Sequence, residues 1–136
     1  MTELYPYSAK EALKRDELEL WRKSHYENQD CKNAIEDIIR QNFDGMHLKH
    51  DCIYPIVEKY GWDRTELVLA VTLREMDWDG RFSRANKEWA TNVDVPEDGS
   101  HNIALIVRSH PAVLDGYIQL FRAAQNQEIQ SGMTME

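Results

Sequence analysis

The sequence has little cysteine, few basic residues and no long hydrophobic run. Its two cysteines, Cys31 and Cys52, are too few for a disulfide scaffold among 136 residues, which favours reduced thiols that fill core space. No apolar run approaches the roughly 18 residues of a membrane span, and we expect no basic-then-apolar leader. We therefore expect a cytoplasmic protein that does not enter a membrane.

The shortage of basic residues bears on possible partners. Sixteen Lys and Arg stand against 24 Asp and Glu, and the formal net charge is −8. Binding to DNA, RNA or an anionic membrane requires a basic surface that neutralises phosphate, so this composition counts against all three. The acidic excess is spread over both halves of the chain and forms no acidic tail. Composition thus excludes several classes and selects no function.

Helical signals are present throughout the first part of the chain. Ser8 and Glu11 have the spacing of a capping box, which predicts a short helix that starts there. Less polar positions then recur at steps of three and four, which predicts one long helix over about residues 16–42. Its apolar stripe is interrupted by His25 and Asn28, so it is less apolar than a coiled-coil seam.

Two glycines and a second capping-box spacing divide the middle of the chain. Gly45 is expected to end the long helix, and Gly61 to end a third helix over about residues 51–60. Asp63 and Glu66 then predict the capped start of a mostly buried helix.

The last third of the sequence combines helix signals with one strand candidate. Ser83 predicts the cap of a short helix, and Pro111 the start of a last helix that ends near Gln125. The apolar run 103–107 is typical of a strand, and residues 46–48 could supply its partner.

Together these elements predict the fold class and the domain boundary. We expect a mostly α protein, a single compact domain of about five or six helices with at most a small β element. The domain is expected to cover residues 1–125, followed by a frayed C-terminal tail over residues 126–136.

The densest group of polar and aromatic residues runs from residue 77 to residue 89. Arg81 and Arg84 are three residues apart, so on a helix they share a face and could clamp a phosphate or carboxylate. Two tryptophans could anchor a protein partner, because Trp and Arg dominate interface hot spots. The predicted partner-binding residues are Trp78, Asp79, Arg81, Arg84, Asn86, Lys87 and Trp89.

The same residues have a structural alternative. In that interpretation the tryptophans belong to the core, and the arginines pair with Asp77, Asp79 and Glu88 to hold the turn. Loss of the fold on substitution of Arg81 and Arg84 would favour this alternative.

Metal and enzyme motifs are weak or missing. His47, His50, Asp51 and Cys52 offer zinc donors, but their spacing matches no standard finger, so we expect no metal and no cofactor. The chain lacks G-x-S-x-G, G-x-x-x-x-G-K-[ST], H-E-x-x-H and C-x-x-C, and we therefore expect no catalytic residues and no enzyme. Three arrangements stay open: a carboxylate pair at Asp77 and Asp79, a Ser109–His110 pair, and Cys31 with His25.

Several strings spread along the chain resemble a known family. The most distinctive are W-D-G-R-F-S-R-x-N-K-x-W from Trp78 to Trp89 and S-H-P-A-V-L-D-G from Ser109 to Gly116. With shorter matches such as L-Y-P-Y-S-A and N-F-D-G, they resemble a domain of unknown function found on mobile elements of anaerobic gut bacteria. The resemblance covers nearly the whole chain and brings no activity or catalytic residue with it. It implies the company of conjugative elements, prophages and their accessory genes.

The resemblance and the acidic charge together suggest a class of function. Small acidic proteins of mobile elements are often inhibitors of host defences, and an acidic surface suits a basic nucleic-acid channel. We therefore expect an interaction protein that inhibits a host-defence nuclease, namely an anti-CRISPR protein that binds a Cas9-type effector. The alternative is a nucleic-acid- or nucleotide-binding accessory protein of plasmid or conjugative transfer, in which Arg81, Arg84 and Lys87 hold phosphate.

Overall fold

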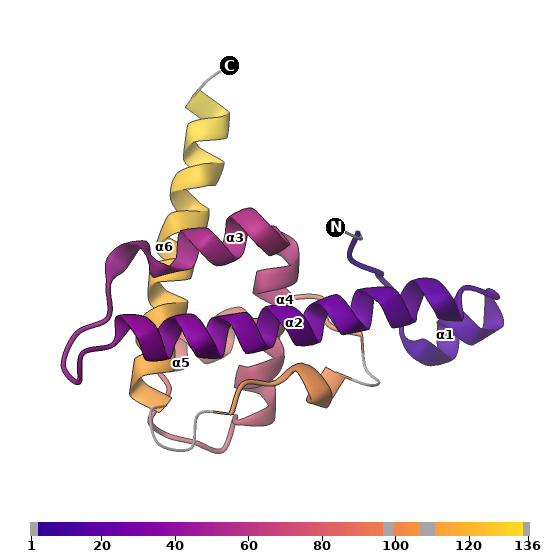
Figure 1. The fold of residues 1–136 in the computed structure, drawn as a ribbon, viewed down its shortest axis with the longest axis horizontal. Coiled ribbons are helices and arrows are strands. Elements are labelled where there is room, and N and C mark those ends of the chain that lie inside the picture. Colours follow the sequence, from indigo (N-terminus) through magenta and orange to yellow (C-terminus); the bar gives the residue numbers. More distant parts are fainter. Residues whose placement is uncertain (1–2, 97–99, 107–110, 135–136) are drawn as a thin grey trace.

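The computed structural model describes residues 3–96, 100–106 and 111–134. In this part of the chain, six α-helices and two short 3-10 helices follow one another without a sheet, which confirms the predicted mostly α class (Figure 1). No helix of the described ranges is both long and apolar enough to cross a membrane. The elements are α1 (Ala9–Lys14), α2 (Leu18–Asn42), η1 (His50–Ile53), α3 (Tyr54–Tyr60), α4 (Trp62–Glu75), α5 (Arg84–Thr91), η2 (Ser100–Ile103) and α6 (Pro111–Thr134).

Helix α4 is buried along most of its length, and α2, α3 and α5 pack against it. The long helix α2 crosses the front of the molecule in Figure 1, with α3 beside it and α6 running behind it at a steep angle. Fully buried side chains of α2, α4 and α6 meet in the core. Among them are Ile35 of α2, Leu69 of α4, and Tyr117 and Phe121 of α6. The C-terminal end of α6 extends away from the other helices (Figure 1).

Two of the predicted helix caps are confirmed. The Ser8 hydroxyl accepts a hydrogen bond from the Glu11 backbone N–H at 3.1 Å and starts α1. The Ser83 hydroxyl accepts one from the Asn86 N–H at 3.3 Å and starts α5. Each bond satisfies one of the backbone donors that the first turn of a helix leaves without a partner.

The predicted capping box at Asp63 and Glu66 is wrong. Gly61 takes a φ of +88°, which interrupts the helical path, and α4 begins at the next residue without a side-chain cap. Asp63 therefore lies inside the first turn, and Glu66 instead accepts a hydrogen bond from the Gln125 amide of α6. The spacing fitted a cap, but the glycine moved the start of the helix by two residues.

The predicted strand is also wrong within the described residues. Ser100–Ile103 is a 3-10 helix, and the Leu105 backbone N–H donates at 2.8 Å to the Thr72 hydroxyl of α4. Ile103 and Leu105 are buried, so the apolar run packs against the helical core instead of pairing with residues 46–48. Over the ranges that the structure describes, the β structure is one isolated bridge between Phe43 and Leu48.

The last helix is longer than predicted. It was expected to end near Gln125, whereas α6 continues to Thr134. Residues 126–131 contain neither proline nor glycine, so nothing in this stretch stops a helix that is already formed. Most of the segment predicted as a tail therefore continues the backbone of α6.

Both cysteines fill core space, as predicted. Cys31 and Cys52 are free thiols with at most 2% of their surface exposed. Burial raises the pKa of the Cys31 thiol to about 12 and that of the Cys52 thiol to about 11.

We expect neither thiol to be reactive in the folded protein. A thiol reagent attacks the thiolate, and both access and ionisation are suppressed here. With Ellman's reagent near pH 8, the thiols of the native protein should react on the timescale of unfolding. In protein unfolded by guanidinium, both thiols should react at once. Rapid titration of one thiol in the native protein would contradict the burial, and a Cys52→Ala variant would assign it.

Candidate functional site

The segment predicted as the partner site forms the turn between α4 and α5, together with α5 itself. The Asp79 carboxylate, 4% exposed, accepts two hydrogen bonds from the Arg81 guanidinium, at 3.0 Å from Nε and 2.8 Å from a terminal nitrogen. It also accepts the Arg81 backbone N–H at 2.9 Å. These bonds hold the pKa of Asp79 below its ordinary value. The hydrogen bond from the guanidinium has the larger effect, and the bond from the backbone N–H comes second.

A second contact holds the turn against α5. The Lys87 ammonium donates to the backbone carbonyl of Asp77 at 3.0 Å. The turn is therefore restrained at two points, one within itself and one from the helix that follows. Trp78 lies between these restraints and is 76% exposed.

Asn86 is a structural residue that joins α5 to α6. It is fully buried, and its amide donates to Asp115 of α6, at 2.8 Å to the carboxylate and 3.1 Å to the backbone carbonyl. Its carbonyl oxygen accepts from the Arg122 guanidinium at 2.8 Å. The same Asp115 carboxylate accepts the Ser83 backbone N–H at 2.9 Å. The two most distinctive strings of the sequence thus meet through this network.

Trp89 and Arg84 occupy opposite environments on α5. Trp89 is half-buried, with its ring centroid 6.1 Å from that of Phe121, and the Arg122 guanidinium lies 5.8 Å from its centroid. The Arg84 side chain is 92% exposed and pairs with Glu88 at 3.1 Å.

The structure thus divides the seven predicted residues into two groups. Asp79, Asn86, Lys87 and Trp89 make the contacts that hold the turn and α5 in place. Trp78, Arg81 and Arg84 have side chains that reach solvent. Arg81 and Arg84 are each paired with a carboxylate. These pairs disfavour the predicted phosphate clamp, because an incoming anion would have to displace both carboxylates.

The open catalytic arrangements gain no support from the described residues. The lowered pKa of Asp79 is the opposite of what a general acid needs. Cys31 is fully buried with a raised pKa, which is the opposite of an activated nucleophile. Ser109 and His110 lie outside the described residues.

The candidate zinc donors do not converge. His47, His50 and Asp51 are exposed, whereas Cys52 points into the core. Within the ranges that the structure describes, no group of three or more histidine, cysteine, aspartate or glutamate side chains is placed to hold a metal ion.

A buried arginine on α4 is a feature that the sequence did not reveal. The Arg64 guanidinium, 2% exposed, donates to the Ser24 carbonyl at 2.7 Å and to the Asn28 side chain, and it lies 3.4 Å from the Glu27 carboxylate. Burial lowers the pKa of Arg64, and the charge of Glu27 opposes that shift. One feature of the sequence does reflect this contact. Asn28 interrupts the apolar stripe of α2, and its side chain accepts a hydrogen bond from Arg64.

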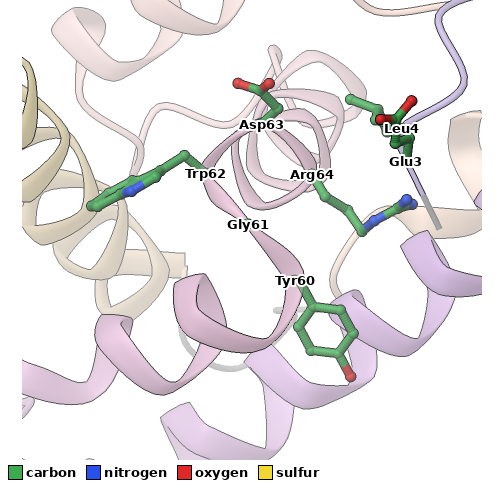
Figure 2. A pocket seen from close by; sticks show the side chains of 7 residues that line it. All are labelled: Glu3, Leu4, Tyr60, Gly61, Trp62, Asp63 and Arg64. Atoms are coloured by element: carbon green, nitrogen blue, oxygen red, sulfur yellow. The ribbon is translucent and has the colours of Figure 1, made fainter. Parts of the chain in front are cut away.

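Arg64 stands beside a surface hollow of about 640 Å³ at the N-terminal end of α4 (Figure 2). In Figure 2 its side chain points toward the N-terminal segment, while Asp63 and Tyr60 point to different sides. A second hollow of about 480 Å³ shares two lining residues with the first, and a third of about 550 Å³ shares one. The first hollow is lined by Glu3, Leu4, Tyr60, Gly61, Trp62, Asp63 and Arg64.

Comparison with known proteins places the chain in a family. A family model described as "Protein of unknown function (DUF3849)" matches residues 4–126. No curated protein and no solved structure matches the chain. The matched range contains the α4–α5 turn and the Asn86–Asp115 network, and it agrees with the predicted resemblance to a domain of unknown function. The chain therefore belongs to the DUF3849 family of proteins of unknown function.

Proposed function

We propose that this chain is an interaction protein that binds a protein partner through the exposed side of its α4–α5 turn. We name this region the Trp78 surface, defined by Trp78, Arg81 and Arg84. The observation that carries the proposal is a tryptophan left 76% exposed on a turn that neighbouring side chains hold in place. Tryptophan and arginine are the residues that most often dominate the binding energy of an interface.

The restraints on the turn favour binding. A flexible loop loses conformational entropy when it docks, and that loss reduces its affinity. Here Asp79 and Lys87 already limit the conformations of the segment before any partner arrives. We therefore expect the Trp78 surface to bind with little rearrangement of its backbone.

We further propose that the partner is a guide-loaded nuclease of host defence, a CRISPR effector of the Cas9 type, and that the chain is encoded on a mobile element. This step rests on the family resemblance and on the net charge of −8, which complements a basic nucleic-acid channel. The proposal places the protein in the cytoplasm, where such effectors act and where buried thiols stay reduced.

Substitution of Trp78 should weaken binding strongly and leave the fold intact. Because most of its ring is in water, Trp78→Ala should change the thermal midpoint little, yet weaken recovery of the effector at least about tenfold. The measurement is a tagged pull-down from a nuclease-treated bacterial lysate with an active CRISPR system, read by mass spectrometry. Tyr26→Ala, which removes a 58% exposed aromatic ring from α2, is the matched control.

Stoichiometric recovery of one effector by the wild type and by Tyr26→Ala, but not by Trp78→Ala, would support the proposal. Recovery of no effector, or equal recovery by all three proteins, would contradict it. A thermal shift with nucleotides or short DNA that salt abolishes would instead favour the phosphate-binding accessory role.

A further inference from the structure

Two of the hollows adjoin at the N-terminal end of α4, and we treat them as one groove. The first two share Leu4 and Asp63, so the depression runs from the start of α4 to the segment that follows α5. Apolar and aromatic side chains contribute to both hollows: Leu4, Leu67 and Val93, together with parts of Trp62 and Trp89. We call this depression the acidic groove, because four carboxylates contribute to its lining, namely Glu3, Asp63, Glu66 and Asp94.

The lining of the groove contains four carboxylates and one basic residue. Two further arginines lie beside the lining: Arg74 donates to the Val93 carbonyl, and the Arg122 guanidinium lies 5.8 Å from the Trp89 ring centroid. Arg64 is the basic residue of that lining, and it is buried and already paired with Glu27 of α2. The third hollow, which adjoins the first at Tyr60, adds further acidic residues and one lysine. Its lining includes Glu27, Asp30, Asp37 and Lys59.

We propose that the acidic groove binds an extended segment of a protein partner that is rich in lysine and arginine. Such a segment matches both properties of the site. The ammonium and guanidinium groups of its side chains pair with the carboxylates, while the aliphatic stems of Lys and Arg lie along apolar and aromatic surface. The negative charge excludes nucleic acid as the occupant.

This inference deepens the proposed function, and it rests on that proposal in assuming a protein partner. The groove begins at the N-terminal end of α4, and Trp78 follows the C-terminal end of that helix. Trp78 lines neither hollow, so the two surfaces share no lining residue and can be engaged by different parts of one partner. Two linked contacts raise the overall affinity above that of either contact alone.

The first experiment locates the binding site on the unmodified protein. A nona-arginine peptide is titrated into the ¹⁵N-labelled chain, whose four tryptophans give four indole N–H resonances. We expect the indoles of Trp62 and Trp89, which line the groove, to shift, and those of Trp21 and Trp78 to stay in place. Shifts at Trp78 alone, equal shifts at all four, or no shift would each overturn the proposal.

The second experiment distinguishes binding in the groove from non-specific attraction by the overall negative charge of the protein. Asp63→Asn, Glu66→Gln and Asp94→Asn together remove three carboxylates from the lining. The matched control removes three exposed carboxylates elsewhere, through Glu19→Gln, Asp51→Asn and Glu75→Gln. Both variants have the same net charge, so non-specific attraction falls equally in both.

The groove variant should bind nona-arginine at least about tenfold more weakly than wild type, and the control less than about threefold more weakly. Equal weakening, or none in the groove variant, would overturn the proposal. The assay contains no effector, so its failure is distinct from a failure of the pull-down that tests the Trp78 surface.

Discussion

Replacing Asn86 by leucine should lower the free energy of unfolding by about 4 kcal/mol, although the two side chains are similar in size. The leucine would leave the Asp115 carboxylate and the Arg122 guanidinium facing a buried apolar group. Hydrogen bonds to charged partners contribute about 1.5–3 kcal/mol each, and Asn86 makes such bonds on both sides. Urea denaturation followed by circular dichroism measures the change.

A surface asparagine serves as the control for this substitution. Asn126 is exposed on the same helix that Asn86 contacts, and Asn126→Leu should change the stability by no more than about 0.5 kcal/mol. A double-mutant cycle of Asn86→Ala and Asp115→Ala should show coupling, because both changes remove the hydrogen bond between the Asn86 amide and the Asp115 carboxylate. Additive effects, or equal effects of the two leucine variants, would show that the network does not hold α5 to α6.

Replacing Arg64 by methionine should cost about 3–5 kcal/mol of stability, the range found when one partner of a buried ion pair is removed. The guanidinium is 2% exposed, and its loss would leave the Glu27 carboxylate and the Asn28 carbonyl oxygen without their buried donor. Arg22→Met is the matched control: Arg22 pairs with Glu19 on the surface of α2, and such pairs contribute about 0–1 kcal/mol.

The Arg64 contacts also predict a rescue. Replacing Glu27 and Asn28 by methionine and leucine in the Arg64→Met background should restore part of the lost stability, because the Glu27 carboxylate and the Asn28 carbonyl oxygen are then removed together with the guanidinium that they face. The melting temperatures of the single and triple variants measure this difference. A triple variant no more stable than Arg64→Met would mean that the cost comes from lost packing rather than from unpaired polar groups.

The sequence was informative where local chemistry decides structure. Ser8 and Ser83 cap helices as predicted, because a hydroxyl three residues before a free backbone N–H needs nothing from the rest of the fold. The long helix from Leu18 to Asn42 follows from the spacing of its apolar positions. The capping box at Asp63 failed because Gly61, one residue before the start of α4, had already set the backbone at a positive φ.

The sequence singled out a candidate site but did not show which of its residues are buried and which are exposed. The constellation from residue 77 to residue 89 stood out by composition, yet nothing in its order shows that Asn86 is buried and Trp78 exposed. That distinction depends on Asp115 and Arg122 of α6, which approach α5 only when the chain is folded. The acidic groove was not predicted, because Glu3, Asp63 and Asp94 are far apart in sequence.

By itself, the sequence determined the helical class, the caps at Ser8 and Ser83, and the acidic charge that counts against nucleic-acid binding. These properties follow from side-chain spacing and composition, which are local or additive along the chain. The tertiary structure alone decided which polar residues hold the fold and which face solvent. The physical reason is that burial and pairing depend on contacts between distant segments, such as Arg64 with α2 and Asn86 with α6.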